Sequence, residues 1–63
     1  MDATERIALN GQVQKAVASF KRGESGAFTA GWTKGAGKSQ TRGNYPWRVT
    51  VEAQGVFVRF NDD

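Results

Sequence analysis

The sequence predicts an α+β fold in which an N-terminal helix packs on a three-stranded antiparallel sheet. Apolar residues recur at helical spacing near the N-terminus, alternate over residues 27–33, and form a hairpin pattern over residues 47–60. With 63 residues, the chain has room for one small core, so we treat residues 1–63 as a single domain. An all-β small barrel, with residues 12–20 as a strand, is the alternative.

The first predicted element is a helix from Asp2 to about Arg22. Asp2 can cap its start, and Glu5, three residues later, can reach back to the amide of the cap. Gly23 fits the position just past the last turn. The apolar stripe of this helix consists of Leu9, Val13, Ala16, Val17 and Phe20.

The pair Asn10-Gly11 opposes this helix, because Asn-Gly between apolar residues is also typical of a hairpin turn. A hairpin there would place Leu9 opposite Gln12, so that an apolar side chain faces a polar one. The helix is therefore favoured. A helix that starts only at Asn10, after an extended segment 6–9, remains open.

Residues 27–33 alternate between apolar and small or polar side chains, which predicts one strand. Gly31 within it weakens the strand or marks a close approach of another backbone. Residues 34–46 show no periodicity and contain three glycines, three basic residues and no acid. We expect a flexible basic loop there, and loops of this length are usually functional or disordered.

The C-terminal hairpin is expected to turn at Gln54-Gly55. This turn pairs Ala53 with Val56, Val51 with Val58, and Val49 with Phe60.

The hairpin separates an apolar face from a mixed one. The apolar face is extended by Trp47, and we expect Trp32 and Trp47 in the core and Tyr45 exposed. An outward Phe57 suggests a partner surface. The mixed face contains Arg48, Thr50, Glu52, Phe57 and Arg59.

Charge is unevenly distributed along the chain, whose net charge is +3. No acidic residue lies between Ser25 and Val51, whereas four basic residues do. Such a segment attracts polyanions or acidic protein surfaces.

Catalysis, metals and cofactors find no support in the composition. The chain has no histidine and no cysteine, and its acids lie near the ends. Gly37-Lys38-Ser39 ends like a phosphate-binding loop, but Trp32 stands where that loop needs a glycine, and a poor helix sequence follows. We therefore expect neither an enzyme nor a cofactor.

The function we expect is nucleic-acid binding, to DNA or RNA, by the basic loop and the mixed hairpin face. The alternative is a protein–protein module, such as a small inhibitor or adaptor, that binds an acidic partner with Phe57 as anchor. A structural subunit whose loop orders on assembly is a third possibility.

The chain has no apolar run near the length of a membrane span and no N-terminal signal peptide, so a cytoplasmic location is expected. A homo-oligomer is plausible for so small a core. The candidate binding residues are Lys34, Lys38, Arg42, Tyr45, Arg48, Phe57 and Arg59.

Overall fold

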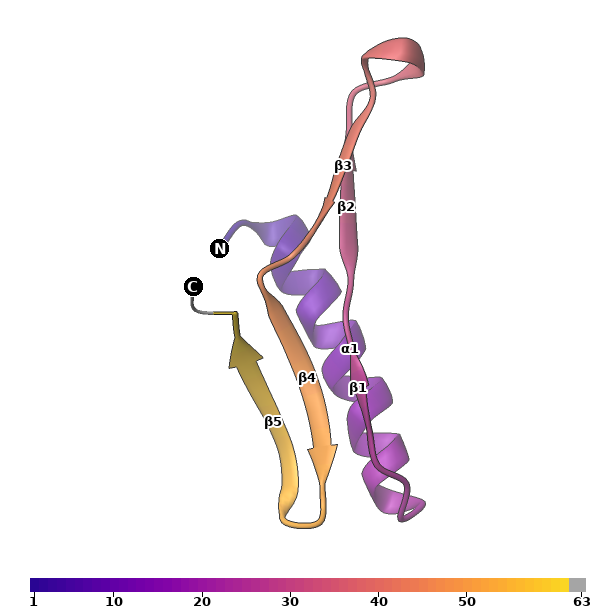
Figure 1. Ribbon diagram of the computed structural model, residues 1–63, viewed down its shortest axis with the longest axis vertical. Helices are drawn as coiled ribbons and strands as arrows, with labels where there is room; N and C mark the ends of the chain where they lie inside the picture. Colours follow the sequence, from indigo (N-terminus) through magenta and orange to yellow (C-terminus); the bar gives the residue numbers. More distant parts are fainter. Residues whose placement is uncertain (62–63) are drawn as a thin grey trace.

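The computed structural model describes residues 1–61 and confirms the α+β class (Figure 1). Both of its sheets are open, so the barrel alternative is wrong. Within residues 1–61, no helix is long and apolar enough to cross a membrane. The elements are helix α1 (Ala3–Lys21), strands β1 (Gly26–Phe28) and β2 (Gly31–Lys34), the 3-10 turn η1 (Gly37–Ser39), and strands β3 (Thr41–Asn44), β4 (Trp47–Glu52) and β5 (Gly55–Phe60).

Helix α1 begins and ends as its sequence indicates. Asp2 Oδ1 accepts a hydrogen bond from the Glu5 amide at 2.8 Å. At the other end, the amide of Glu24 bonds to the Ser19 carbonyl at 3.0 Å, and Gly23 takes a positive φ of 76°. This is a helix ending closed by two backbone hydrogen bonds, in which glycine suits the residue with positive φ. The helix runs unbroken through residues 10 and 11, so a late start at Asn10 is wrong.

Gly11 leaves room for a stabilising substitution. A Cβ built on Gly11 meets no atom within 4 Å beyond the helix itself. Because glycine in a helix interior costs about 0.5–1 kcal/mol relative to alanine, we expect Gly11→Ala to raise the free energy of unfolding by that amount. Urea denaturation of both chains checks this, and an unchanged or lower midpoint would contradict it.

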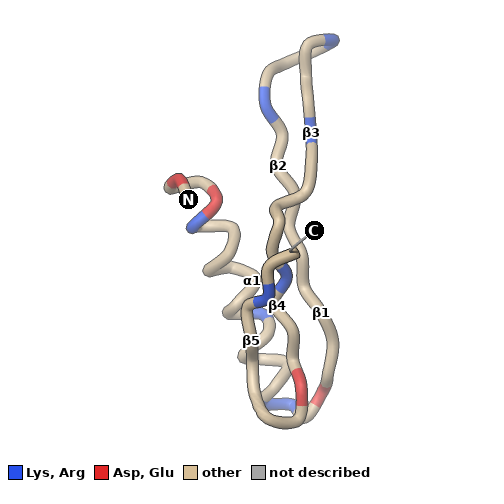
Figure 2. The backbone as a smooth tube through the Cα atoms, turned by 60° about the vertical axis from the view of Figure 1, so that its left-hand side comes forward, with Lys and Arg blue, Asp and Glu red and all other residues tan. Residues whose placement is uncertain are grey.

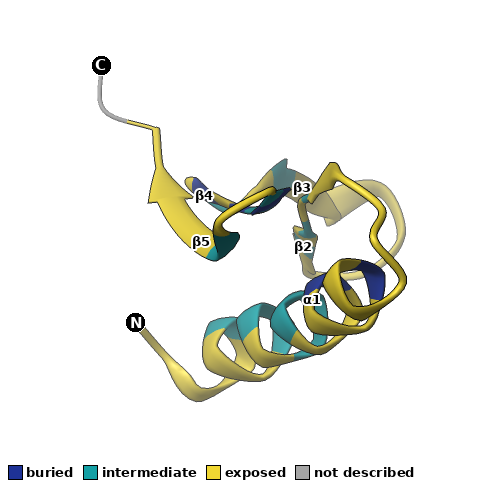
Figure 3. Ribbon diagram, turned by 90° about the horizontal axis from the view of Figure 1, so that it is seen from below, coloured by how far each residue is buried: buried dark blue, intermediate teal, exposed yellow. Residues whose placement is uncertain are grey.

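The three-stranded sheet has the order β1-β4-β5 with antiparallel neighbours, so β4 lies in the middle. Helix α1 packs on one of its faces, and β4 gives most of the fully buried side chains (Figure 3). The helical stripe is rotated from the predicted one, because Ser19 is buried whereas Val17 and Phe20 are 37% and 40% exposed. The buried apolar core is Ala16, Trp47, Val49 and Val51.

The hairpin forms, but its predicted register is wrong, because the two-residue turn lies one residue earlier in the chain than predicted. Glu52 pairs with Gly55, so Ala53 and Gln54 make the turn. Each cross-strand partner therefore shifts by two residues, which leaves both faces of the hairpin as expected. The observed register adds the apolar pair Trp47–Phe60, which the predicted one would have lost.

Residues 27–33 form two short strands rather than the one strand expected. β1 pairs with β4 in the main sheet, and β2 pairs with β3 in a separate two-stranded sheet. Phe28 pairs with Val49, while the Tyr45 amide bonds to the Ala30 carbonyl at 3.0 Å. Thr29 thus stands opposite three residues, 46–48, one of which is proline and lacks an amide donor. This local mismatch separates the two sheets.

Candidate functional site

Residues 31–44, which we call the ribbon, replace most of the loop expected at 34–46. Strands β2 and β3 pair over four residues each, and η1 closes the far end. Within residues 1–61, α1 packs on β1, β4 and β5 but not on β2 or β3. The ribbon therefore projects from the body and lengthens the molecule to 43 Å against 25 and 19 Å in the other directions (Figure 1).

Glycines explain why this segment pairs instead of forming a loop. A Cβ on Gly31 would lie 2.9 Å from the Gly43 carbonyl oxygen. The two backbones are therefore closer together than a residue with a side chain at position 31 would allow. A Cβ on Gly43 would lie 2.6 Å from the Trp32 ring. The Trp32 ring thus covers its cross-strand partner, which has no side chain of its own.

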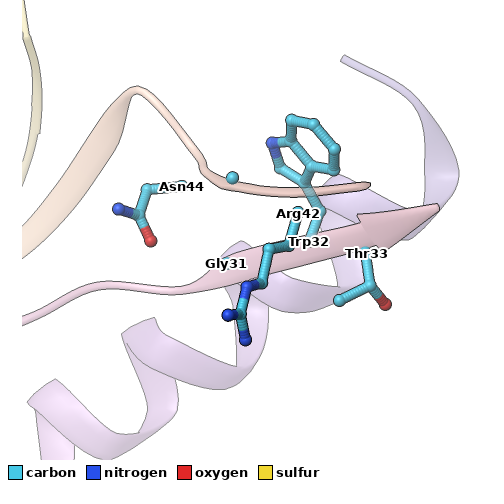
Figure 4. A pocket seen from close by; sticks show the side chains of 6 residues that line it. Gly31, Trp32, Thr33, Arg42 and Asn44 are labelled. Carbon is cyan, nitrogen blue, oxygen red and sulfur yellow. The ribbon is translucent and has the colours of Figure 1, made fainter. Parts of the chain in front are cut away.

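Trp32 is consequently not a core residue, contrary to expectation. It is half-buried on the ribbon, with Lys34 Nζ 5.6 Å from the centre of a ring. In Figure 4 the Trp32 ring stands on one side of the ribbon and the Arg42 guanidinium on the other. The ribbon therefore has one aromatic side and one arginine side.

The aromatic side of the ribbon faces the start of α1. Trp32 and Lys34 line a cleft of about 310 Å³ together with the acidic residues Asp2 and Glu5 and with Tyr45. The positive charge of Lys34 therefore lies near carboxylates of the same chain. This side is less suited to an anionic ligand than the other.

Tyr45 is part of the body packing, so its expected exposure is wrong. Its ring stacks on that of Trp47, with centroids 5.4 Å apart and planes 8° from parallel. The Trp47 indole donates a hydrogen bond from Nε1 to Glu5 Oε2 at 2.8 Å. Removal from water, together with the carboxylates of Asp2 and Glu5, raises the pKa of the Tyr45 phenol. Trp47 therefore covers one face of the ring, while the Tyr45 side chain still lines the cleft.

The outer face of β4 and β5 places two arginines directly opposite each other. Arg48 pairs with Arg59 in the strand register. Arg48 donates to the neutral side chain of Asn61, Nη2 to Oδ1 at 3.1 Å, a partner that the sequence did not indicate. Arg59 forms a salt bridge with Glu52 at 2.5 Å.

Glu52 and Phe57 complete this face. Hydrogen bonds from Arg59 and Thr50 lower the pKa of the Glu52 carboxyl. Phe57 is 39% exposed, and the Arg59 guanidinium lies 5.4 Å from its ring centre. Phe57 points outward, as the alternation of the strand predicts.

Side-chain alternation joins the arginine side of the ribbon to this outer face. Ala30 and Tyr45, whose backbones are hydrogen-bonded, pack against the core. Two positions along the ribbon from this pair, Trp32 and Gly43 have side-chain positions on the core side, and Arg42, the next residue before Gly43, points to the opposite side. We call the resulting group, Arg42, Arg48 and Arg59, the outer arginines.

The seven predicted binding residues are thus divided among three places. Phe57 lies with the outer arginines on one side of the molecule. Lys34 and Tyr45 line the cleft on the other side. Lys38 lies in η1 at the ribbon tip. Figure 2 shows basic positions, and no acidic ones, along the ribbon.

The fold and charges describe a small α+β protein with a projecting basic ribbon. Comparison of the chain with protein-family models, with curated protein sequences and with solved structures finds no match in any of the three.

Proposed function

We propose that this protein is a non-enzymatic nucleic-acid-binding protein whose outer arginines contact phosphates. The observation that supports the proposal most is the direct opposition of Arg48 and Arg59. Like charges directly opposite in a sheet are destabilising. Glu52 forms a salt bridge with Arg59, while the hydrogen bond of the Arg48 side chain within residues 1–61 goes to the neutral amide of Asn61. A bound phosphate would place a negative charge beside Arg48.

The shape of the ribbon supports the same function. The major groove of duplex DNA is about 12 Å wide and admits a two-stranded ribbon. The ribbon has no acidic residue, and Arg42 extends the outer arginines along its length. In this arrangement the hairpin face contacts one stretch of phosphates while the ribbon enters the adjacent groove. A cytoplasmic location belongs to the same proposal.

Salt dependence of binding tests the proposal. Labelled double- and single-stranded DNA and RNA of one sequence are titrated with the protein at about 50 and 200 mM salt. If three arginines each neutralise a phosphate, affinity for the duplex falls roughly 40-fold between these salt concentrations. The preferred form of nucleic acid follows from comparing the four ligands.

A matched pair of variants tests which side of the ribbon binds. Arg42→Gln and Lys34→Gln remove the same charge from facing strands of the ribbon. We expect Arg42→Gln to weaken binding and lower the salt slope by about one, and Lys34→Gln to have the smaller effect because Lys34 lies in the acidic cleft. Equal effects would show that only net charge matters. Absence of binding to all four ligands at low salt overturns the proposal and favours an acidic protein partner.

A further inference from the structure

Strand β5 leaves an unprotected edge on the main sheet. It is the last strand in the order β1-β4-β5, so one side of its backbone has no strand partner within residues 1–61. Exposed edges are ordinarily blocked by proline, by short length, or by charged side chains at the edge. β5 is six residues long, contains no proline, and has one charged residue, Arg59, which is already bound to Glu52.

Apolar side chains at this edge are also uncovered. On the helix side of β5, Val58 and Phe60 are 41% and 56% exposed, and Figure 3 shows most of the strand as exposed. The adjoining helix α1, which contacts β5, exposes Val17 and Phe20. An edge that combines free backbone groups with apolar side chains is suited to pairing with another strand.

The side chains of β5 complement a second copy of β5. Antiparallel pairing centred on Val58 places Val58 opposite its own copy, Val56 opposite Phe60, and Phe57 opposite Arg59. The first two pairs join apolar residues on the helix side. The third joins a cation to an aromatic ring on the outer face, a contact these two residues already make within one chain.

The neighbouring registers are worse. A centre at Arg59 places Arg59 opposite its own copy, so two like charges face each other. A centre at Phe57 also pairs apolar residues, Phe57 with its own copy and Val56 with Val58, but it places Arg59 opposite Gly55, which has no side chain to contact. Of these three registers, the one centred on Val58 is favoured because it alone places an aromatic ring opposite Arg59.

We propose that two copies of this chain form a twofold dimer in which β5 pairs with β5, centred on Val58. The two sheets become one of six strands, β1-β4-β5-β5-β4-β1, with both helices on the same face. Dimer formation enlarges the core of a chain whose size makes a lone core marginal. This inference does not depend on nucleic-acid binding.

Mass and cross-linking test the dimer. We expect sedimentation equilibrium of the unmodified protein to give twice the monomer mass of 6.9 kDa. The chain has no cysteine, so single cysteines can be placed freely. Residues directly opposite in an antiparallel pair have Cα atoms about 4.5–5.5 Å apart, within the range of a disulfide. Val58→Cys should therefore form a disulfide-linked dimer under mild oxidation, while Phe60→Cys should not.

A charged substitution gives the second test. Val58→Lys places two positive charges at the twofold axis and should raise the dissociation constant of the dimer about 100-fold or more. Ile7→Lys adds the same charge at a side chain that is 74% exposed on α1 and should leave the dimer unchanged. A monomeric mass at all concentrations, or equal cross-linking through Val58→Cys and Phe60→Cys, would overturn the proposal.

Discussion

Replacing Trp47 with alanine is expected to remove most or all of the stability of this protein at room temperature. Trp47 is fully buried, stacks on Tyr45, and donates a hydrogen bond to Glu5. Truncating a buried tryptophan costs about 3–5 kcal/mol. A domain of this size has a free energy of unfolding of roughly 3–9 kcal/mol, so the loss removes much or all of it.

Circular dichroism with urea denaturation measures this effect, and Trp47→Phe is its control. Phenylalanine keeps a ring for the stack with Tyr45 but removes the indole donor to Glu5. We expect this variant to fold and to lose about 1.5–3 kcal/mol, the value of a hydrogen bond to a charged group. If Trp47→Ala unfolds at a urea concentration close to that of the unmodified chain, the core assigned to β4 is wrong.

Replacing Gly43 with alanine is expected to loosen the ribbon while the body stays folded. The added Cβ would lie 2.6 Å from the Trp32 ring, which must leave its place over the strand. Overpacking of this kind costs about 1–3 kcal/mol. Because α1 does not pack on β2 or β3, the cost stays within the ribbon. Amide hydrogen exchange in residues 31–44 should become roughly ten- to hundredfold faster.

Gly26→Ala is the matched control for this variant. Gly26 is also a strand glycine, in β1, but a Cβ there meets nothing within 4 Å. It should leave exchange in the ribbon unchanged. If amide exchange in β4 also becomes faster in the Gly43→Ala variant, the conclusion that the ribbon loosens without affecting the body is wrong.

The helix and the faces of the hairpin could be predicted because local signals determine them. Asp2 and Gly23 define the ends of α1 through contacts within one turn. The buried stripe of α1 is rotated from the predicted one because packing on the sheet, not the helix sequence, decides which side of the helix is buried. Ser19 is therefore buried in place of an apolar neighbour. Glu5 accepts from Trp47 rather than completing the cap, a contact across 42 positions that no local pattern encodes.

The ribbon could not be predicted because its two strands pair at glycines, which have no side chains. Gly31 and Gly43 weaken the strand pattern in sequence, yet they allow the close approach and the Trp32 contact that hold the two strands together. The same contact draws Trp32 away from the core. The candidate site was accordingly predicted in part: the outer hairpin residues lie where expected, whereas Lys34 and Tyr45 lie across the molecule from them.

The separation of Trp32 from Trp47 provides two optical probes, one in each half of the chain. Trp47 lies in the core against Tyr45, and Trp32 lies half-buried on the ribbon beside Lys34. Emission from a Trp32→Phe chain therefore reports on the body alone, and its difference from the unmodified chain reports on the ribbon. Quenching by an added solute would separate events at the ribbon from unfolding of the core without any attached dye.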